Sequence, residues 1–131
     1  MCEPRFPSPM DRARKALSGA VTCAVVRGKN IRISEQRGIA PVVLWLDEEP
    51  DSLRGAYVAD RVVGKAAALL FAYAGVAGVY ARVMSRLAVS TLKLHAIPYH
   101  AGRVVDYIEN RGRLQTLNHS LLLQEIMLQC R

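Results

Sequence analysis

The chain has 131 residues, of which 51% are hydrophobic, and this length and composition are typical of one domain with a single packed core. Its formal net charge of +7, carried by 14 arginines and 4 lysines, favours anionic partners, although a bias of composition or solubility would produce the same excess. The longest uncharged run covers the 16 residues 66–81, which is shorter than the roughly 20 residues of a membrane-spanning helix.

The three cysteines are widely spaced and odd in number, which excludes a disulfide framework and a zinc knuckle. This cysteine use indicates reduced thiols, so we expect a cytoplasmic protein. The N-terminus is rich in proline and has no apolar core like that of a signal peptide. We therefore expect a disordered tail over residues 1–9 and a single domain over residues 10–131.

The first elements are indicated by spacing and by turn residues. Apolar residues at Met10, Ala13 and Leu17 predict a helix that is capped near Gly19. The stretch "VTCAVVRGKNIRISE" predicts a β-hairpin around a turn at residues 28–30. "RGIAPVVLWLDEE" favours a helix from Pro41, with a strand as the alternative.

The segment over residues 55–96 predicts strand, helix, strand, helix. "GAYVA" is a short apolar strand, and "DRVVGKAAALLFAYAG" is a helix that Gly75 ends. "VAGVYARVMS" is a buried strand, and "SRLAVSTLKLHA" is a helix with Ser85 at its N-cap. A short element in "GRVVDYI" and an amphipathic helix in "NHSLLLQEIMLQC" follow.

This alternation predicts parallel strands joined by right-handed crossovers. The nearly continuous apolar runs fit strands that are covered on both faces. The predicted fold class is therefore α/β, with one sheet and helices on both of its faces.

Polar residues gather where the two predicted strands lead into their helices, and neighbouring strands would bring them into one cleft. Ligands of open α/β sheets lie beyond the carboxyl ends of the strands, where helix N-termini favour anions. Gly64 falls in the first turns of a predicted helix, where glycine costs about 1 kcal/mol relative to alanine. Close approach by a ligand or by another backbone would explain why glycine stands there. The alternative is that Asp60 and Ser85 are ordinary N-caps. Lys65 and Arg86 would then extend from half-buried helices to water. The candidate residues are Asp60, Arg61, Gly64, Lys65, Ser85 and Arg86.

The hairpin is a second candidate site, because its basic residues could follow a nucleic-acid backbone. It has no interleaved aromatic residues for base stacking, which favours a merely solvated hairpin. Cys23, inside a predicted strand, fits a packed apolar side chain better than a nucleophile. The basic residues of the hairpin region are Arg27, Lys29, Arg32 and Arg37.

The blocks "VADRVVGKAAALL", "VYARVMS" and "LAVSTLKLHAI" together resemble a small bacterial family of unknown function that has the cytidine-deaminase-like fold. The resemblance covers roughly residues 10–113 and implies a three-layer α/β/α sandwich with a mixed central sheet. Zinc deaminases need a His or Cys with a Glu at one helix start and Pro-Cys-x-x-Cys at the next. Here the two helix starts read "ADRVVGK" and "MSRLAVS", so we expect no zinc and no classical deamination.

Members of this family continue after an Asn-Arg pair with Cys-Pro-x-Glu, whereas this chain reads "GRLQTLNHSLLLQ" at that place. The family-like polar positions that remain are Asp60, Lys65, Ser85, Asn110 and Arg111. Asn110 and Arg111 therefore join the candidate ligand-binding residues on the strength of the resemblance.

These observations predict a domain without metal or cofactor that binds a small anionic ligand, such as a nucleotide or sugar phosphate. One alternative is a metal-independent enzyme in which Lys65 and Asp60 form an acid–base pair in a closed pocket. The other is a nucleic-acid-binding module that uses the basic hairpin. We expect no membrane association. The apolar helix over residues 66–75 suggests a homo-oligomer.

Overall fold

The computed structural model describes residues 8–36 and 38–108. The helix that we expected over residues 118–130, and the candidate residues Arg37, Asn110 and Arg111, lie outside these ranges. The described elements follow in the order α1 (Pro9–Ala16), β1 (Cys23–Arg27), β2 (Asn30–Ser34), α2 (Ala40–Glu48), β3 (Tyr57–Val63), α3 (Lys65–Ala74), β4 (Gly78–Ser85), α4 (Arg86–Leu94) and β5 (Tyr99–Val105).

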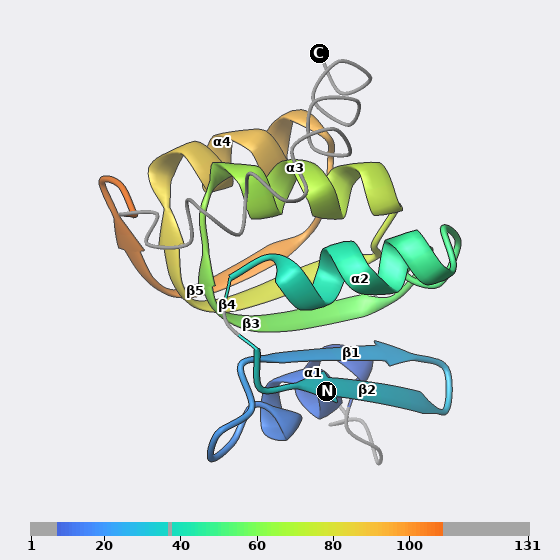
Figure 1. Cartoon of the computed structure of the whole chain (residues 1–131). Coiled ribbons are helices and arrows are strands. Elements are labelled where there is room, and N and C mark those ends of the chain that lie inside the picture. Colours follow the sequence, from blue (N-terminus) through green and yellow to red (C-terminus); the bar gives the residue numbers. More distant parts are fainter. Residues whose placement is uncertain (1–7, 37, 109–131) are drawn as a thin grey trace, which may run out of the picture.

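The five strands form one mixed sheet in the order β2-β1-β3-β4-β5 (Figure 1). The strand β1 is antiparallel to both β2 and β3, while β3, β4 and β5 run parallel to one another. The helices α3 and α4 make the two connections between the parallel strands. The predicted hairpin and the predicted parallel pairing are both confirmed.

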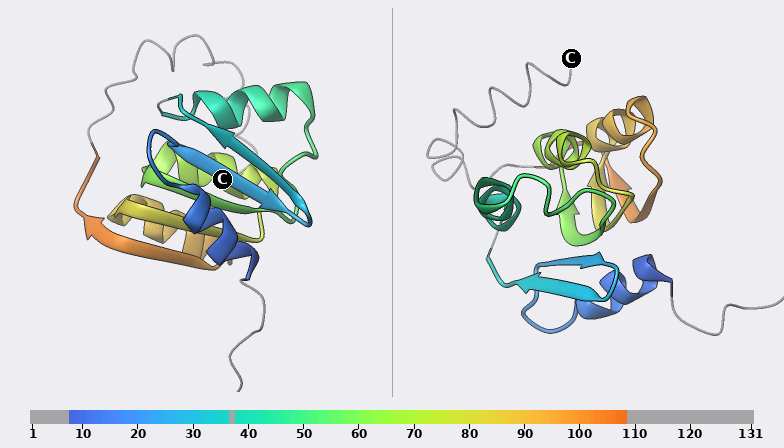
Figure 2. Two further views of the ribbon diagram at one scale, coloured as in Figure 1. Left: turned by 90° about the horizontal axis from the view of Figure 1, so that it is seen from below. Right: turned by 90° about the vertical axis from the view of Figure 1, so that its right-hand side faces the viewer.

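Helices lie on both faces of this sheet, as the sequence predicts. Figures 1 and 2 show α1 against one face and α2, α3 and α4 against the other. Under α1, a small core of buried residues includes Ala13, Leu17 and Val26. The larger core lies between the sheet and the other three helices, with Leu70 and Phe71 fully buried. The molecule is therefore a mixed α/β sandwich.

Most element boundaries agree with the expected ones. The helix α2 begins at Ala40, which settles the choice between helix and strand in favour of a helix. Gly75 is the C-cap of α3 in the left-handed conformation, with a φ of 75°. The helix α1 ends at Ala16 with Leu17 as its C-cap, so Gly19 lies beyond the cap.

The boundary between β3 and α3 differs from the prediction. The sequence predicts a strand that ends before Asp60, whereas β3 continues through Asp60 to Val63 and α3 begins only at Lys65. The β-branched residues Val62 and Val63 favour a strand, and their pairing with β4 extends it. Asp60 is therefore a buried residue within a strand and does not cap a helix.

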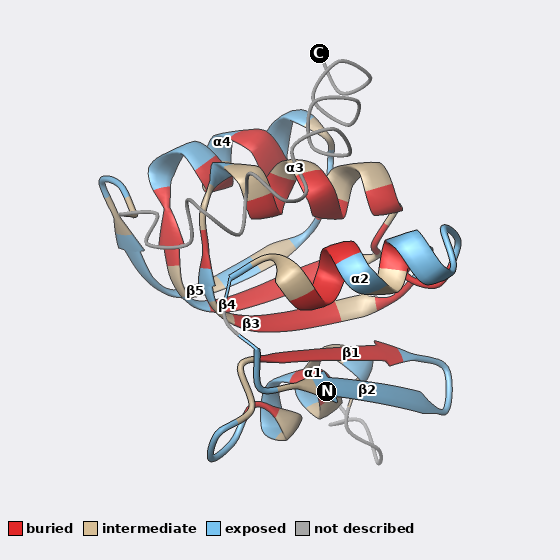
Figure 3. Ribbon diagram, in the orientation of Figure 1, coloured by how far each residue is buried: buried red, intermediate tan, exposed pale blue. Residues whose placement is uncertain are grey.

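The helix α3 lies between α2 and α4 in Figure 1, and its apolar side packs into the larger core. Five of its ten residues are buried and four are half-buried, and Figure 3 shows these segments in red and tan. The surplus apolar surface from which we expected a homo-oligomer is thus largely covered. Within the described ranges, no helix is long and apolar enough to cross a membrane.

Candidate functional site

The C-terminal ends of the neighbouring strands β3 and β4 lie side by side. Val63 pairs with Met84 in the parallel register, so the next residues, Gly64 and Ser85, are also neighbours. Each of these two residues is the N-cap of the helix that follows it. The expectation that the two strand-to-helix junctions come together is therefore confirmed for Gly64, Ser85 and the helix starts.

The N-termini of α3 and α4 are capped differently. The buried Ser85 accepts a hydrogen bond at Oγ from the backbone N–H of Ala88 over 3.0 Å, which is an ordinary N-cap. Gly64 has no side chain, so α3 begins without a side-chain cap. The start of α3 thus leaves backbone N–H groups without the side-chain oxygen that usually accepts from them.

Gly64 does not lie inside the helix, contrary to the sequence prediction. Its φ of −98° is accessible to any residue, so backbone strain does not require glycine here. A Cβ atom built at Gly64 would have Ile108 Cβ, at 4.0 Å, as its nearest neighbour among the described residues. With respect to residues 8–36 and 38–108, a Cβ atom therefore fits at Gly64 without a clash.

Two cations occupy the first positions of these helices. Lys65 of α3 and Arg86 of α4 are both exposed. The Nε atom of Arg86 donates to Asp106 Oδ1 over 2.7 Å, and both side chains of this pair are largely exposed. Lys65 forms no ion pair within the part of the chain that the structure describes, so its ammonium group can meet a ligand.

Asp60 lies in the sheet with 8% of its surface exposed, directly opposite Cys23 of β1. Burial raises the pKa of Asp60 from 3.8 to about 7, against the opposing effect of the backbone N–H groups of Val62 and Arg61. Near neutral pH the Asp60 carboxyl group therefore exists in both protonation states. It can donate a hydrogen bond when protonated and accept one when ionised.

Cys23 is 1% exposed, in agreement with the expected packed apolar role. Burial raises the pKa of its thiol well above 9.0, and the carboxylate of Asp60 raises it further. A thiol with such a pKa is a poor nucleophile at neutral pH.

Arg61 does not reach the candidate site. Successive side chains of a strand point to opposite faces of the sheet, so Arg61 lies on the α1 face while Asp60 lies on the other. The guanidinium of Arg61 donates from Nε to the carbonyl of Val21 over 2.9 Å and from Nη2 to the carbonyl of Gly19. The expectation that Arg61 faces the same cleft is wrong, because its guanidinium holds the connection between α1 and β1.

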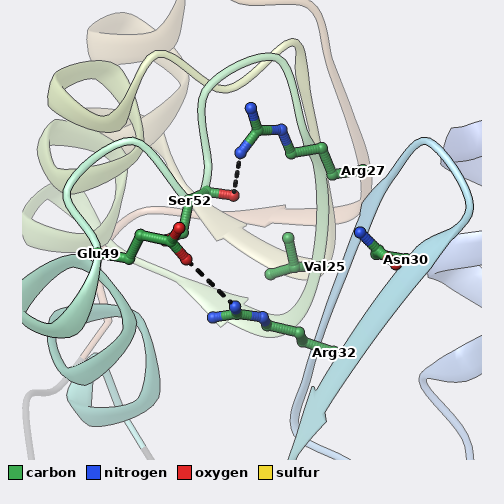
Figure 4. A pocket seen from close by; sticks show the side chains of 6 residues that line it. All are labelled: Val25, Arg27, Asn30, Arg32, Glu49 and Ser52. Carbon is green, nitrogen blue, oxygen red and sulfur yellow. Dashed lines mark hydrogen bonds and ion pairs between the residues drawn. The ribbon is translucent and has the colours of Figure 1, made fainter.

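The basic hairpin also differs from the outward-facing ribbon that nucleic-acid binding would need. Figure 4 shows Arg27 and Arg32 pointing toward the connection between α2 and β3, around a cavity of about 160 Å³. The Nη1 atom of Arg27 donates to the carbonyl of Asp51 over 2.9 Å, and Arg32 pairs with Glu49 at 3.5 Å. These two arginines stabilise a loop.

A group of aromatic and basic side chains that the sequence did not indicate lies on the α1 face. Tyr80 of β4 stacks on His100 of β5 with ring centroids 5.6 Å apart, and Arg14 of α1 lies over the Tyr80 ring. Only the pairing of β4 with β5 brings these rings together, so nothing in the local sequence reveals them. Among the described residues, no group of three or more His, Cys, Asp or Glu side chains could hold a metal ion.

Fold and site together define a mixed α/β domain in which two parallel strands end beside two helix starts. The chain belongs to the DUF1893 family, because the model of this domain of unknown function matches residues 12–116. A solved structure of a DUF1893 family protein, TM1506 from Thermotoga maritima, is similar, with a TM-score of 0.64 and 21% sequence identity. The match covers 83% of this chain and 80% of that chain, and at this identity it shows the fold alone. No curated protein matches the chain.

Proposed function

We propose that this protein binds a small anionic ligand, such as a nucleotide or a sugar phosphate, at the adjacent starts of α3 and α4. The observation that carries the proposal is the parallel register, which sets the N-caps Gly64 and Ser85 side by side. Helix N-termini present unpaired N–H groups and a positive dipole end, and both favour an anion. Such ligands commonly bind beyond the carboxyl ends of parallel strands.

Each residue of the proposed site would make a different contact with the ligand. The uncapped start of α3 at Gly64 offers backbone N–H groups to a phosphate oxygen, and the exposed Lys65 supplies a positive charge. Arg86 adds a second charge, part of which Asp106 already neutralises. Asp60, which the sequence suggested as the acceptor for a hydroxyl group of the ligand, is left out, because it is buried within β3 three residues before the strand ends. The resemblance also assigns Asn110 and Arg111 to this site, whereas Arg61 is left out because it lies on the opposite face.

The fold that accompanies this proposal is the cytidine-deaminase-like one. Its support is the mixed sheet, with an antiparallel hairpin at one side and two successive crossover helices on one face. In zinc deaminases these helix starts carry the metal ligands. Here Gly64, Lys65, Ser85 and Arg86 occupy them, so we propose a ligand-binding domain rather than a zinc deaminase.

Two other functions have less support. A metal-independent acid–base pair of Lys65 and Asp60 needs a closed pocket, yet Lys65 is exposed and Asp60 is buried in the sheet. Nucleic-acid binding by the hairpin needs free arginines, yet Arg27 and Arg32 already hold the loop between α2 and β3.

A thermal-shift titration with inorganic phosphate, nucleotides and sugar phosphates tests the proposal. A ligand at about 100 times its dissociation constant should stabilise the folded chain by roughly 2.7 kcal/mol, which raises Tm by several degrees. Lys65→Ala should abolish the shift. Lys93→Ala, which removes an exposed lysine from the last turn of α4, should retain it. A shift that survives in Lys65→Ala, or no shift with any of these ligands, would overturn the proposal.

A further inference from the structure

The outer edge of β2 has no strand beside it within the described ranges. β2 is the first strand in the sheet order and pairs with β1 alone. Its two isoleucines, Ile31 and Ile33, are 49% and 55% exposed. An edge strand with free backbone groups and exposed apolar side chains is a template for pairing with another strand, and monomeric proteins usually protect such edges.

Both isoleucines lie on the same face of the sheet, which is the face that carries α1. Ile31 pairs with Val26 and Ile33 pairs with Ala24, and residues opposite each other on neighbouring strands share a face. Val26 is buried under α1, whereas Ile31 and Ile33 lie one strand farther out and stay exposed. The apolar surface under α1 therefore continues to the edge of the sheet.

We propose that two copies of this chain pair β2 with β2, antiparallel and about a twofold axis at Arg32, to form one continuous ten-stranded sheet. In this register Ile31 of each copy faces Ile33 of the other, so that four isoleucines form a single apolar cluster on the α1 face. The main-chain hydrogen bonds come from the free edges of both strands.

The sequence of β2 selects this register. A symmetric pairing centred on Ile31 would place Ile33 opposite Lys29, and one centred on Ile33 would place Ile31 opposite Glu35. An offset of one residue would place Ile31 opposite Arg32. Only the register centred on Arg32 matches both isoleucines with isoleucines, and such matched apolar pairs stabilise antiparallel strands.

The opposite face of the proposed sheet also accommodates this pairing. The two Arg32 side chains meet at the axis, and each already has Glu49 of its own chain within 3.5 Å. This carboxylate offsets the repulsion between the two guanidinium groups. It can also pair with Arg32 of the other copy.

The second edge of the sheet, β5, does not match itself when it is paired about its central residue. Antiparallel pairing of β5 about Gly102 would place Ala101 opposite Arg103 and His100 opposite Val104. Pairing of β2 with β5 would join unlike edges head to tail, which leads to rings or open filaments rather than to a twofold dimer. These comparisons favour β2 as the contact between two copies.

Sedimentation velocity on the full chain tests this interface, because a dimer has twice the 14.4 kDa mass of the monomer. We expect a dimer, and we expect Ile33→Lys to weaken its association at least tenfold while the circular dichroism spectrum is retained. Leu94→Lys is the matched control, since Leu94 is an exposed apolar residue of α4 at 77% exposure. A wild-type monomer at every concentration would overturn the proposal, and so would a dimer that Leu94→Lys disrupts and Ile33→Lys does not.

The register has its own test by disulfide formation, in a background in which Cys2 and Cys130 are replaced by serine. Residues directly opposite each other across antiparallel strands have Cα atoms about 5 Å apart, which a disulfide can bridge. Under mild oxidation Arg32→Cys should form a covalent dimer, whereas Ile31→Cys alone should not, since it faces Ile33. A covalent dimer of Ile31→Cys alone, without one of Arg32→Cys, would overturn the register.

Discussion

Cys23 and Asp60 lie opposite each other on β1 and β3, and both are buried beneath the layer of α2, α3 and α4. A thiol and a carboxyl group in such a place have pKa values above their ordinary ones, because burial disfavours the charged form of each. The carboxyl group lies within β3, three residues before the strand ends at Val63. Its ionisation therefore connects the stability of the fold to the pH.

Asp60 should make the folded chain less stable as the pH rises. Its pKa is about 7 when folded and near 3.8 when unfolded, so the folded state binds the proton more tightly between these values. The stabilisation is complete below about pH 4 and is lost as the pH rises through 7, by up to about 4 kcal/mol. Urea unfolding at intervals between pH 4 and pH 8.5 measures this loss.

Asp60→Asn is the control for that titration, since the amide is nearly isosteric with the protonated acid. The variant should unfold at nearly the same urea concentration as the wild type at pH 4. It should be more stable than the wild type at pH 8.5. A difference between the two proteins that does not change with pH would contradict the burial of an ionisable carboxyl group at Asp60.

The thiol of Cys23 should react slowly with disulfide reagents such as 5,5′-dithiobis(2-nitrobenzoate). Its side chain is 1% exposed and its pKa is raised, so both access and thiolate formation oppose the reaction. In a background without Cys2 and Cys130, we expect the native chain to react at least 100-fold more slowly than the chain in 8 M urea. Equal rates would show that Cys23 is accessible.

Gly64→Ser should raise stability and weaken ligand binding. A serine Cβ would make only ordinary van der Waals contact at this position, and its hydroxyl can cap α3, which is worth a few tenths of a kcal/mol relative to glycine. The same hydroxyl would accept from the N–H groups that we assign to the ligand. Chemical unfolding and ligand titration on one preparation measure both effects, and unchanged affinity in a stabilised variant would count against this site.

Arg27→Ala should destabilise the chain by about 1–2 kcal/mol, because the guanidinium donates to the carbonyls of Asp51 and Ser52 at the start of the loop before β3. Lys29→Ala, in the exposed turn of the same hairpin, should change stability by less than about 0.5 kcal/mol. If salt-dependent binding to single-stranded DNA fell equally in both variants, the hairpin would instead be a nucleic-acid surface.

Local patterns predicted most elements of the fold. The glycine at residue 75, the helical spacing before Gly19 and the turn at residues 28–30 act over a few residues, and the structure agrees with them. The end of β3 could not be found in this way. Asp60 is polar and precedes an alanine-rich stretch, which imitates a helix start, yet pairing with β1 and β4 keeps it in the strand.

The candidate site was predictable only in part, for the same physical reason. That Gly64 and Ser85 are neighbours follows from the parallel connection, which the alternation of strands and helices indicates. Arg61 points away from them because it lies on the opposite face of β3. This orientation could not be predicted, because the strand runs four residues beyond the expected end at Ala59. The pairing of Cys23 with Asp60 depends on β1 lying beside β3, for which the sequence has no local signal.

The measurement that tests the ligand site most directly is a titration of the ¹⁵N-labelled chain with inorganic phosphate and with nucleotides, followed by amide chemical shifts. We expect shifts concentrated at the first residues of α3 and α4, including the amides of Lys65 and Leu87, and their loss in Lys65→Ala. Shifts confined to the hairpin at residues 27–32, or no concentrated shifts at saturating ligand, would contradict this expectation.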